Sequence, residues 1–112
     1  LIKAYAGMDS FLLEQLAKSQ CDGVVIEALG AGNLPPSCLK GVEALLKANI
    51  PVVLTSRAFN GITQDVYDYE GGGKQLKQQG LIFTKGLSGQ KARIKLMVLL
   101  NQPLDKALSE YF

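Results

Sequence analysis

Histidine is absent from this chain of 112 residues, and cysteine occurs only twice, at Cys21 and Cys38. Without histidine, the chain cannot build a Ser-His-Asp or Cys-His catalytic arrangement from its own residues. A closed zinc site needs four ligands, of which two cysteines supply half, so no metal is expected. We expect both cysteines to be free thiols in a reducing compartment, while a disulfide between them stays an open alternative.

Strong charge and long apolar runs are also missing. The net charge is only +2 at pH 7, too small for the concentrated basic face of a nucleic-acid-binding protein. No apolar run approaches the roughly 20 residues needed to span a bilayer. The first ten residues contain no basic leader, so they do not resemble a signal peptide. We therefore expect neither nucleic acid nor a membrane as a partner.

What remains is the composition of one ordinary globular domain, with 47% hydrophobic and 20% charged residues. The length fits a single domain with a core of its own. The chain starts inside an apolar run and without an initiating methionine. We expect it to be part of a longer polypeptide whose localisation signals lie outside these residues.

Short apolar runs alternate with segments of helical periodicity. The runs that indicate strands are 2–7, 23–29, 50–56 and 81–87. Four or five helices are expected: one after Asp9 or Ser10, one from Pro35 to Asn49, one over 74–79 ending at Gly80, one from Ser88 to Pro103, and a final amphipathic segment over 104–111. This alternation predicts an α/β fold, a three-layer Rossmann-like domain with a four-stranded parallel sheet flanked by helices.

In such folds, ligands bind beyond the carboxyl ends of the strands. The loops expected there are 7–9, 30–33, 56–61 and 85–88. Two glycine-rich segments fail as nucleotide loops. The segment GAGNLP has proline where a dinucleotide fingerprint needs its third glycine, and GGGKQ has Gln75 where a phosphate loop needs serine or threonine. No nucleotide cofactor is therefore expected.

Several polar side chains stay ambiguous on spacing alone. Asn33 either supports a turn or helix start before Pro35, or presents its amide to a ligand or another chain. Glu27, in an apolar strand, either joins an ion pair or hydrogen bond, with Arg57 as one candidate partner, or projects into solvent. Arg57 pins a neighbouring loop or clamps a carboxylate. Lys91 and Lys95 are interpreted as a solvated helix face.

Four motifs then occur in a fixed order: GVVIEALGAGNLP, IPVVLTSR, YEGGGKQL and GQKARIKLM. Together they resemble the C-terminal domain of bacterial L-asparaginases, over residues 1 to about 102. The resemblance implies that residues 1–112 form the smaller, C-terminal domain of a two-domain enzyme whose N-terminal catalytic domain lies outside this chain. It also implies an activity: hydrolysis of L-asparagine to L-aspartate and ammonia through a threonine nucleophile in that other domain.

The resemblance assigns roles to particular residues. Asn33 matches a family asparagine that reaches the active site of a neighbouring subunit and orients the substrate and the catalytic groups. A family glutamate that binds the substrate's α-amino group falls at Tyr67 or Asp68, depending on a one-residue gap. No cofactor or metal is implied. The implied partners are L-asparagine, the N-terminal domain of the same polypeptide, and further copies in a homodimer or homotetramer. The implied location is the cytoplasm.

Two other functions stay open at this stage. A glutaminase, or an asparaginase-like subunit of a tRNA-dependent amidotransferase, would share the fold and most of the loop residues. A stand-alone α/β ligand-binding module belongs to a different class of protein. If the chain belongs to an enzyme of this kind, the isolated domain is expected to be inactive, because the nucleophile and the residues that orient it must be held together.

Overall fold

A computed structural model describes the whole chain, residues 1–112. Its strands are β1 (Ile2–Lys3), β2 (Val24–Ala28), β3 (Val52–Ser56) and β4 (Ile82–Phe83). They form one four-stranded sheet in the order β1-β2-β3-β4, and every neighbouring pair is parallel. The α/β fold with a four-stranded parallel sheet and four α-helices is therefore confirmed.

The helices connect or follow these strands. They are α1 (Phe11–Lys18), α2 (Leu39–Lys47), α3 (Gly73–Gln78) and α4 (Gly89–Leu100), with two short 3-10 helices, η1 (Pro36–Cys38) and η2 (Leu108–Tyr111). The final amphipathic segment thus forms a 3-10 helix over its last residues. No helix is long and apolar enough to cross a membrane.

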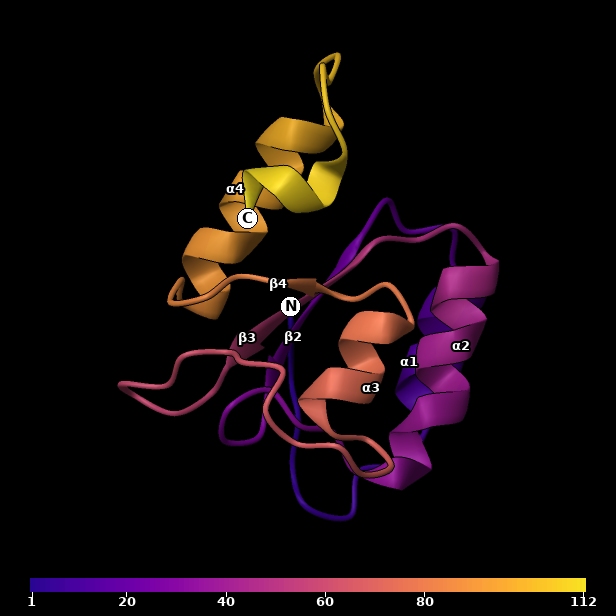
Figure 1. Ribbon diagram of the computed structural model, residues 1–112. Coiled ribbons are helices and arrows are strands. Elements are labelled where there is room, and N and C mark those ends of the chain that lie inside the picture. Colours follow the sequence, from indigo (N-terminus) through magenta and orange to yellow (C-terminus); the bar gives the residue numbers. More distant parts are fainter.

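The order of the strands decides which face each helix covers. Consecutive parallel strands joined by right-handed crossovers place all connecting helices on one face. Accordingly, α1, α2 and α3 lie on one side of the sheet, and α4 with the C-terminal segment lies on the other (Figure 1). The core has a cluster of 16 buried residues on the first side, including Leu13, Leu45 and Leu76, and a cluster of five against α4.

The two edge strands are shorter than the sequence pattern predicts. The runs 2–7 and 81–87 indicated strands, but β1 and β4 have two residues each. Each has only one neighbouring strand, and the chain turns away early, through Gly7 with a φ of 79° and Lys85 with a φ of 62°. These positive φ values end the extended conformation.

The predicted helix boundaries have clear local causes. The Ser88 hydroxyl accepts a hydrogen bond from the Lys91 N–H at the start of α4. Before α1, the cap is the Asp9 carboxylate, which accepts from the Phe11 N–H at 3.0 Å, while the Ser10 hydroxyl donates to Glu14. Asn49 with a φ of 58° and Gly80 with a φ of 103° end the second and third helices as expected.

Candidate functional site

The carboxyl edge of the sheet carries the loops that follow the four strands. Because the strands are parallel, these loops emerge at the same edge. They are linked by hydrogen bonds. The Ser56 hydroxyl donates to the Gly30 carbonyl at 2.6 Å, and the Gln64 N–H donates to the Ala31 carbonyl at 2.8 Å. The Thr63 N–H donates to the Lys85 carbonyl at 2.9 Å, so the loop after β3 contacts the loops after β2 and β4.

Arg57 connects this edge to β1. Its guanidinium donates to the Ala4 carbonyl at 2.7 Å, so it pins a neighbouring loop, which is one of the two roles expected of it. It does not pair with Glu27. That carboxylate lies 3.5 Å from the Lys3 ammonium, because Lys3 stands opposite Glu27 in the register of β1 and β2. The ion pair expected for Glu27 therefore exists, with a different partner from the candidate named.

The GAGN segment is a tight turn whose two ends bond to each other. The Leu29 N–H donates to the Asn33 carbonyl and the Asn33 N–H donates to the Leu29 carbonyl, each at 2.9 Å. Gly30 and Gly32 have φ values of 50° and 111°, which L side chains adopt rarely. The turn therefore projects Asn33 from the rim of the sheet directly after β2.

The Asn33 side chain is half-buried and faces the triple glycine segment. Its Oδ1 accepts a hydrogen bond from the Gly73 N–H at 3.3 Å. Its Nδ2 makes no hydrogen bond within the chain. Asn33 is not a helix cap, because the residue before η1 is Pro35 and no side chain caps that helix. The turn expected of Asn33 is confirmed and the helix cap is wrong, while the alternative that its amide is presented to a ligand or another chain stays a prediction.

The triple glycine Gly71–Gly73 is the packing partner of this turn. All three glycines are buried. The Gly71 carbonyl accepts from the Leu34 N–H at 2.9 Å, and the Gly71 N–H donates to the Gln75 side chain at 2.7 Å. A Cβ on any of the three would collide with a backbone carbonyl oxygen, that of Leu34, Tyr67 or Gln64 respectively. Sequence reasoning rejected this segment as a phosphate loop but missed its packing role, which the order of the motifs alone does not reveal.

Tyr67 and Asp68 lie on the long loop that leads into the triple glycine. Both are exposed, and neither hydrogen bonds to Asn33. The Asp68 carboxylate forms an ion pair with the Lys74 ammonium at 2.7 Å, and this hydrogen bond raises the pKa of Lys74 above its usual value. The Tyr67 ring packs against the Tyr69 ring at a centroid distance of 5.7 Å. The assignment of an amino-group ligand to either residue stays a prediction.

Other predicted side chains have plain structural roles. Both cysteines are free, and burial raises the pKa of the Cys38 thiol above its usual value. Lys91 is exposed, as expected of a solvated helix face. Lys95 departs from that expectation, because its ammonium lies 5.1 Å from the centre of the Phe112 ring.

The whole chain, residues 1–112, matches the model of the Glutaminase/Asparaginase C-terminal domain. The chain belongs to this family. The match explains why the four motifs occur in one order, and it agrees with the resemblance seen in the sequence.

Curated relatives of this chain are named as L-asparaginases and amidotransferase subunits. The chain is 47% identical over 85 residues to a probable L-asparaginase of Deinococcus radiodurans, covering 76% of this chain and 26% of that protein. It is 32% identical over 100 residues to an L-asparaginase of Bacillus licheniformis, covering 89% and 31%. It is also 31% identical over 101 residues to a glutamyl-tRNA(Gln) amidotransferase subunit of Methanococcus maripaludis, covering 89% and 23%. The chain thus spans between 23% and 31% of the length of these relatives.

A solved structure gives the same result for the fold. The crystal structure of a probable cytoplasmic L-asparaginase from Campylobacter jejuni matches with a TM-score of 0.75 and 27% sequence identity. The match covers 91% of this chain and 29% of that one. The relatives are named as L-asparaginases and as an amidotransferase subunit, and the family match makes the chain the C-terminal domain of an asparaginase-family protein.

Proposed function

We propose that this chain is the C-terminal domain of an L-asparaginase, which hydrolyses L-asparagine to L-aspartate and ammonia. In this proposal, the threonine nucleophile belongs to an N-terminal domain outside residues 1–112. The relatives named as L-asparaginases support it, and one of them is 47% identical over 85 residues. The absence of histidine fits a domain that assists catalysis and does not itself carry a histidine-activated nucleophile.

The observation that carries the proposal is the state of the Asn33 side chain. Its Oδ1 is held by the Gly73 N–H, while its Nδ2 has no partner in the chain. One end of the amide is thereby fixed, and the other end is left as a donor at the rim where α/β folds bind ligands. We infer that Asn33 completes the active site of a neighbouring subunit and donates to the substrate or to a catalytic group there.

Fixing the amide in advance matters for catalysis. A donor that is already oriented loses little entropy when the substrate binds, and it stabilises charge that develops in the transition state. Gly30 is exposed and has no side chain, and an added Cβ there would lie 3.7 Å from the Asn33 Nδ2, so another chain can approach the amide closely on this side. Both properties follow from the GAGN turn and the triple glycine together.

The α-amino group of the substrate has two candidate partners in this domain. The Asp68 carboxylate can bind an ammonium by charge, but Lys74 already neutralises it. Tyr67 can form a wall of the pocket and donate or accept one hydrogen bond. We propose that one of these two residues contacts the amino end of the substrate.

The assembly follows from a site shared between subunits. We propose a homodimer or homotetramer in the cytoplasm, in which each C-terminal domain serves the catalytic domain of its neighbour. The cytoplasmic assignment rests on the Campylobacter jejuni protein, which is named as a probable cytoplasmic L-asparaginase.

A second candidate function is that of an amidotransferase component. The glutamyl-tRNA(Gln) amidotransferase subunit of Methanococcus maripaludis matches over 89% of this chain at 31% identity, nearly the same identity as the Bacillus licheniformis enzyme. That archaeal protein shares the domain, so the fold does not separate the two functions.

Ammonia release by the full-length protein tests the proposal. We expect release from L-asparagine without tRNA, ATP or another subunit, and much weaker release from L-glutamine. Release that requires a partner subunit and charged tRNA would favour the amidotransferase. Equal or faster release from L-glutamine would favour the glutaminase, and no release under any of these conditions would contradict the proposal.

A further inference from the structure

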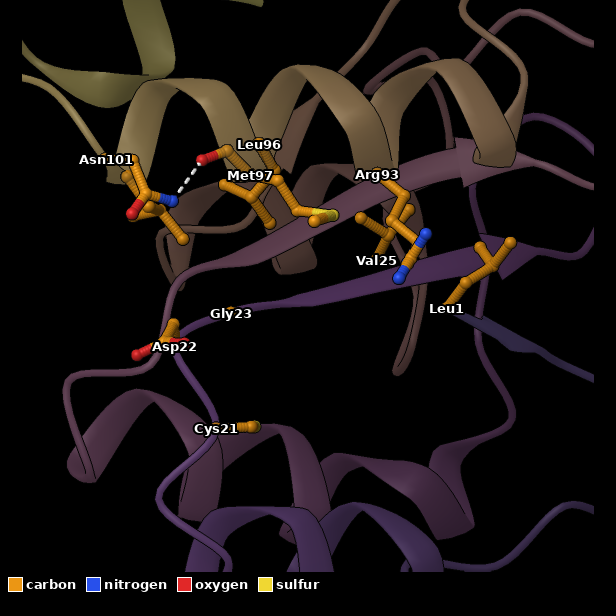
Figure 2. A pocket seen from close by; sticks show the side chains of 10 residues that line it. Leu1, Cys21, Asp22, Gly23, Val25, Arg93, Leu96, Met97 and Asn101 are labelled. Atoms are coloured by element: carbon orange, nitrogen blue, oxygen red, sulfur yellow. Dashed lines mark hydrogen bonds between the residues drawn. The ribbon is translucent and has the colours of Figure 1, made fainter.

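The face of the sheet under α4 is only partly covered. A cavity of about 550 Å³ lies between α4 and the amino-terminal half of β2. Its apolar walls come from both elements and from the first residue: Leu1, Val25, Leu96, Met97 and Leu100. Figure 2 shows Arg93 and Met97 descending from α4 toward β2, with Leu1 at one end of the cavity and Asp22 and Gly23 at the other.

The register of the sheet explains the position of this cavity. β2 pairs with β3 over five residues, but with β1 over only two, Ile2 opposite Ile26 and Lys3 opposite Glu27. Leu1 therefore stands opposite Val25. The cavity begins at Leu1 and runs along β2 toward Gly23, which is the course that β1 would follow if it were extended backwards.

The buried N–H of Val25 also indicates that β1 extends backwards along β2. In a parallel pair, every second residue of a strand makes two hydrogen bonds to the neighbouring strand. Its N–H donates to the carbonyl of the residue before its register partner, and its carbonyl accepts from the N–H of the residue after that partner. The Ala4 N–H donates to the Glu27 carbonyl at 2.9 Å, and Lys3 is the partner of Glu27. By the same alternation, the Val25 N–H is directed at the carbonyl of the residue that precedes Leu1. Val25 is 2% exposed, and buried N–H groups almost always have an acceptor.

We propose that the residues directly N-terminal to Leu1 continue β1 along β2 and fill this cavity. This inference rests on the proposed function, in which the domain is the C-terminal part of a longer polypeptide. The residue before Leu1 accepts the Val25 N–H. The second residue before Leu1 lies on the same face as Leu1 and Lys3, because side chains alternate along a strand. It therefore contacts Met97 and Leu100, and it is apolar.

The topology favours this occupant over a second copy of the chain. The crossovers put α1, α2 and α3 on the opposite face, so within one polypeptide only residues before β1 or after β4 can cover this one. The segment after β4 supplies α4 and η2. The remaining place lies beside β1, and residues joined to Leu1 by a peptide bond start inside it.

Photo-crosslinking in the full-length protein tests the proposal. The variant Met97→p-benzoylphenylalanine places a photoreactive ring in the cavity, at a residue that is 48% exposed. A matched control carries the same ring at Gln15, an exposed residue of α1 on the opposite face. After irradiation, the crosslinked peptides are identified by mass spectrometry. We expect a crosslink within one polypeptide from position 97 to the few residues before Leu1, and none to those residues from position 15.

Three results would overturn the proposal. One is a product of twice the subunit mass from position 97, which assigns the cavity to a second copy. The others are a crosslink only to residues remote from Leu1, and no crosslink at all. A second measurement uses the unmodified full-length protein: the Val25 amide should exchange at least about a hundredfold more slowly than an exposed amide. Neither readout depends on amide hydrolysis, so failure of the proposed function would be seen separately.

Discussion

Asn33 has two polar atoms in different surroundings, and this difference can be tested. Replacing Asn33 with alanine in the full-length protein removes both the bond to Gly73 and the free donor. We expect kcat/KM for L-asparagine to fall about 10- to 100-fold, because a lost buried hydrogen bond costs about 1–3 kcal/mol. Steady-state kinetics of ammonia release measure this effect.

The variant Asn33→Asp separates catalysis from packing. Aspartate keeps an oxygen that can accept from the Gly73 N–H, but it has no NH₂ group to donate. We expect its melting temperature to stay close to that of the wild type while its activity falls as far as that of Asn33→Ala. Normal activity per folded molecule, together with a lower melting temperature in Asn33→Ala, would show that Asn33 only holds the loop.

Gly89 is a second residue whose environment makes a clear prediction. A Cβ at Gly89 would lie 2.5 Å from Oε1 and 2.7 Å from Cγ of Glu27, which is only 8% exposed and has little room to move. We expect Gly89→Ala to destabilise the fold by about 1–3 kcal/mol, as overpacking does. Gly86→Ala is the matched control, because no atom lies within 4 Å of its added Cβ. Thermal unfolding should separate the two variants, and equal melting temperatures would contradict this account.

At the scale of elements, the triple glycine Gly71–Gly73 packs against the turn that carries Asn33 and holds it in position. Gly71 has a φ of 82°, and a Cβ there would meet the Leu34 carbonyl oxygen. We expect Gly71→Ala to lower both stability and activity. The matched control is Gly80→Ala. It also puts a side chain at a positive φ, 103°, but no atom lies within 4 Å of the added Cβ. It should cost only about 1 kcal/mol and leave kcat/KM unchanged. If both variants lost the same activity, the loop would not be what holds Asn33.

An ion pair joins the same loop to α3 and predicts a pH dependence. The hydrogen bond from Lys77 keeps the pKa of Asp65 below its usual value, and the two groups are 2.8 Å apart. Because the pKa is lowered in the folded state, this stabilisation is present above the unfolded pKa of about 4 and is lost as pH falls through the folded value.

The pH dependence is measured as the difference in melting temperature between neutral pH and about pH 3. This difference should be smaller in Asp65→Asn than in the wild type. Asp22→Asn, which removes an exposed acid without an ion pair, is the control and should behave like the wild type. An unchanged difference in Asp65→Asn would contradict the role of the pair.

The elements that the sequence predicts best are those with dense local signals. β2 and β3 lie in mostly apolar runs, Ser88 caps α4, and Asn49 and Gly80 end their helices. The edge strands were predicted too long, because the chain leaves the extended conformation at positive-φ turns through Gly7 and Lys85, which the apolar pattern does not mark. The partner of Glu27 was also missed, since only the register of β1 and β2 brings Lys3 opposite it. For the site, the position of Asn33 follows from the strand order, but its bond to Gly73 joins residues 40 apart.

At the scale of the whole molecule, we propose that the domain is one part of a larger assembly. The relatives are three to four times as long as the matched segment, and the proposed site lies at an open rim. In the proposed function another domain covers this rim and supplies the nucleophile, so we expect the isolated domain to have no amidase activity. In the proposed dimer, each active site combines the N-terminal domain of one subunit with Asn33 of the other.

Subunit mixing tests this central claim most directly. One full-length variant carries Asn33→Ala, and the other lacks the proposed threonine nucleophile, so each homodimer is nearly inactive. After unfolding and refolding together, half of the dimers are mixed, and one of their two sites combines an intact nucleophile with an intact Asn33. The account predicts recovery of about one quarter of the wild-type rate of ammonia release from L-asparagine. A mixture no more active than the average of the two separate variants would contradict it.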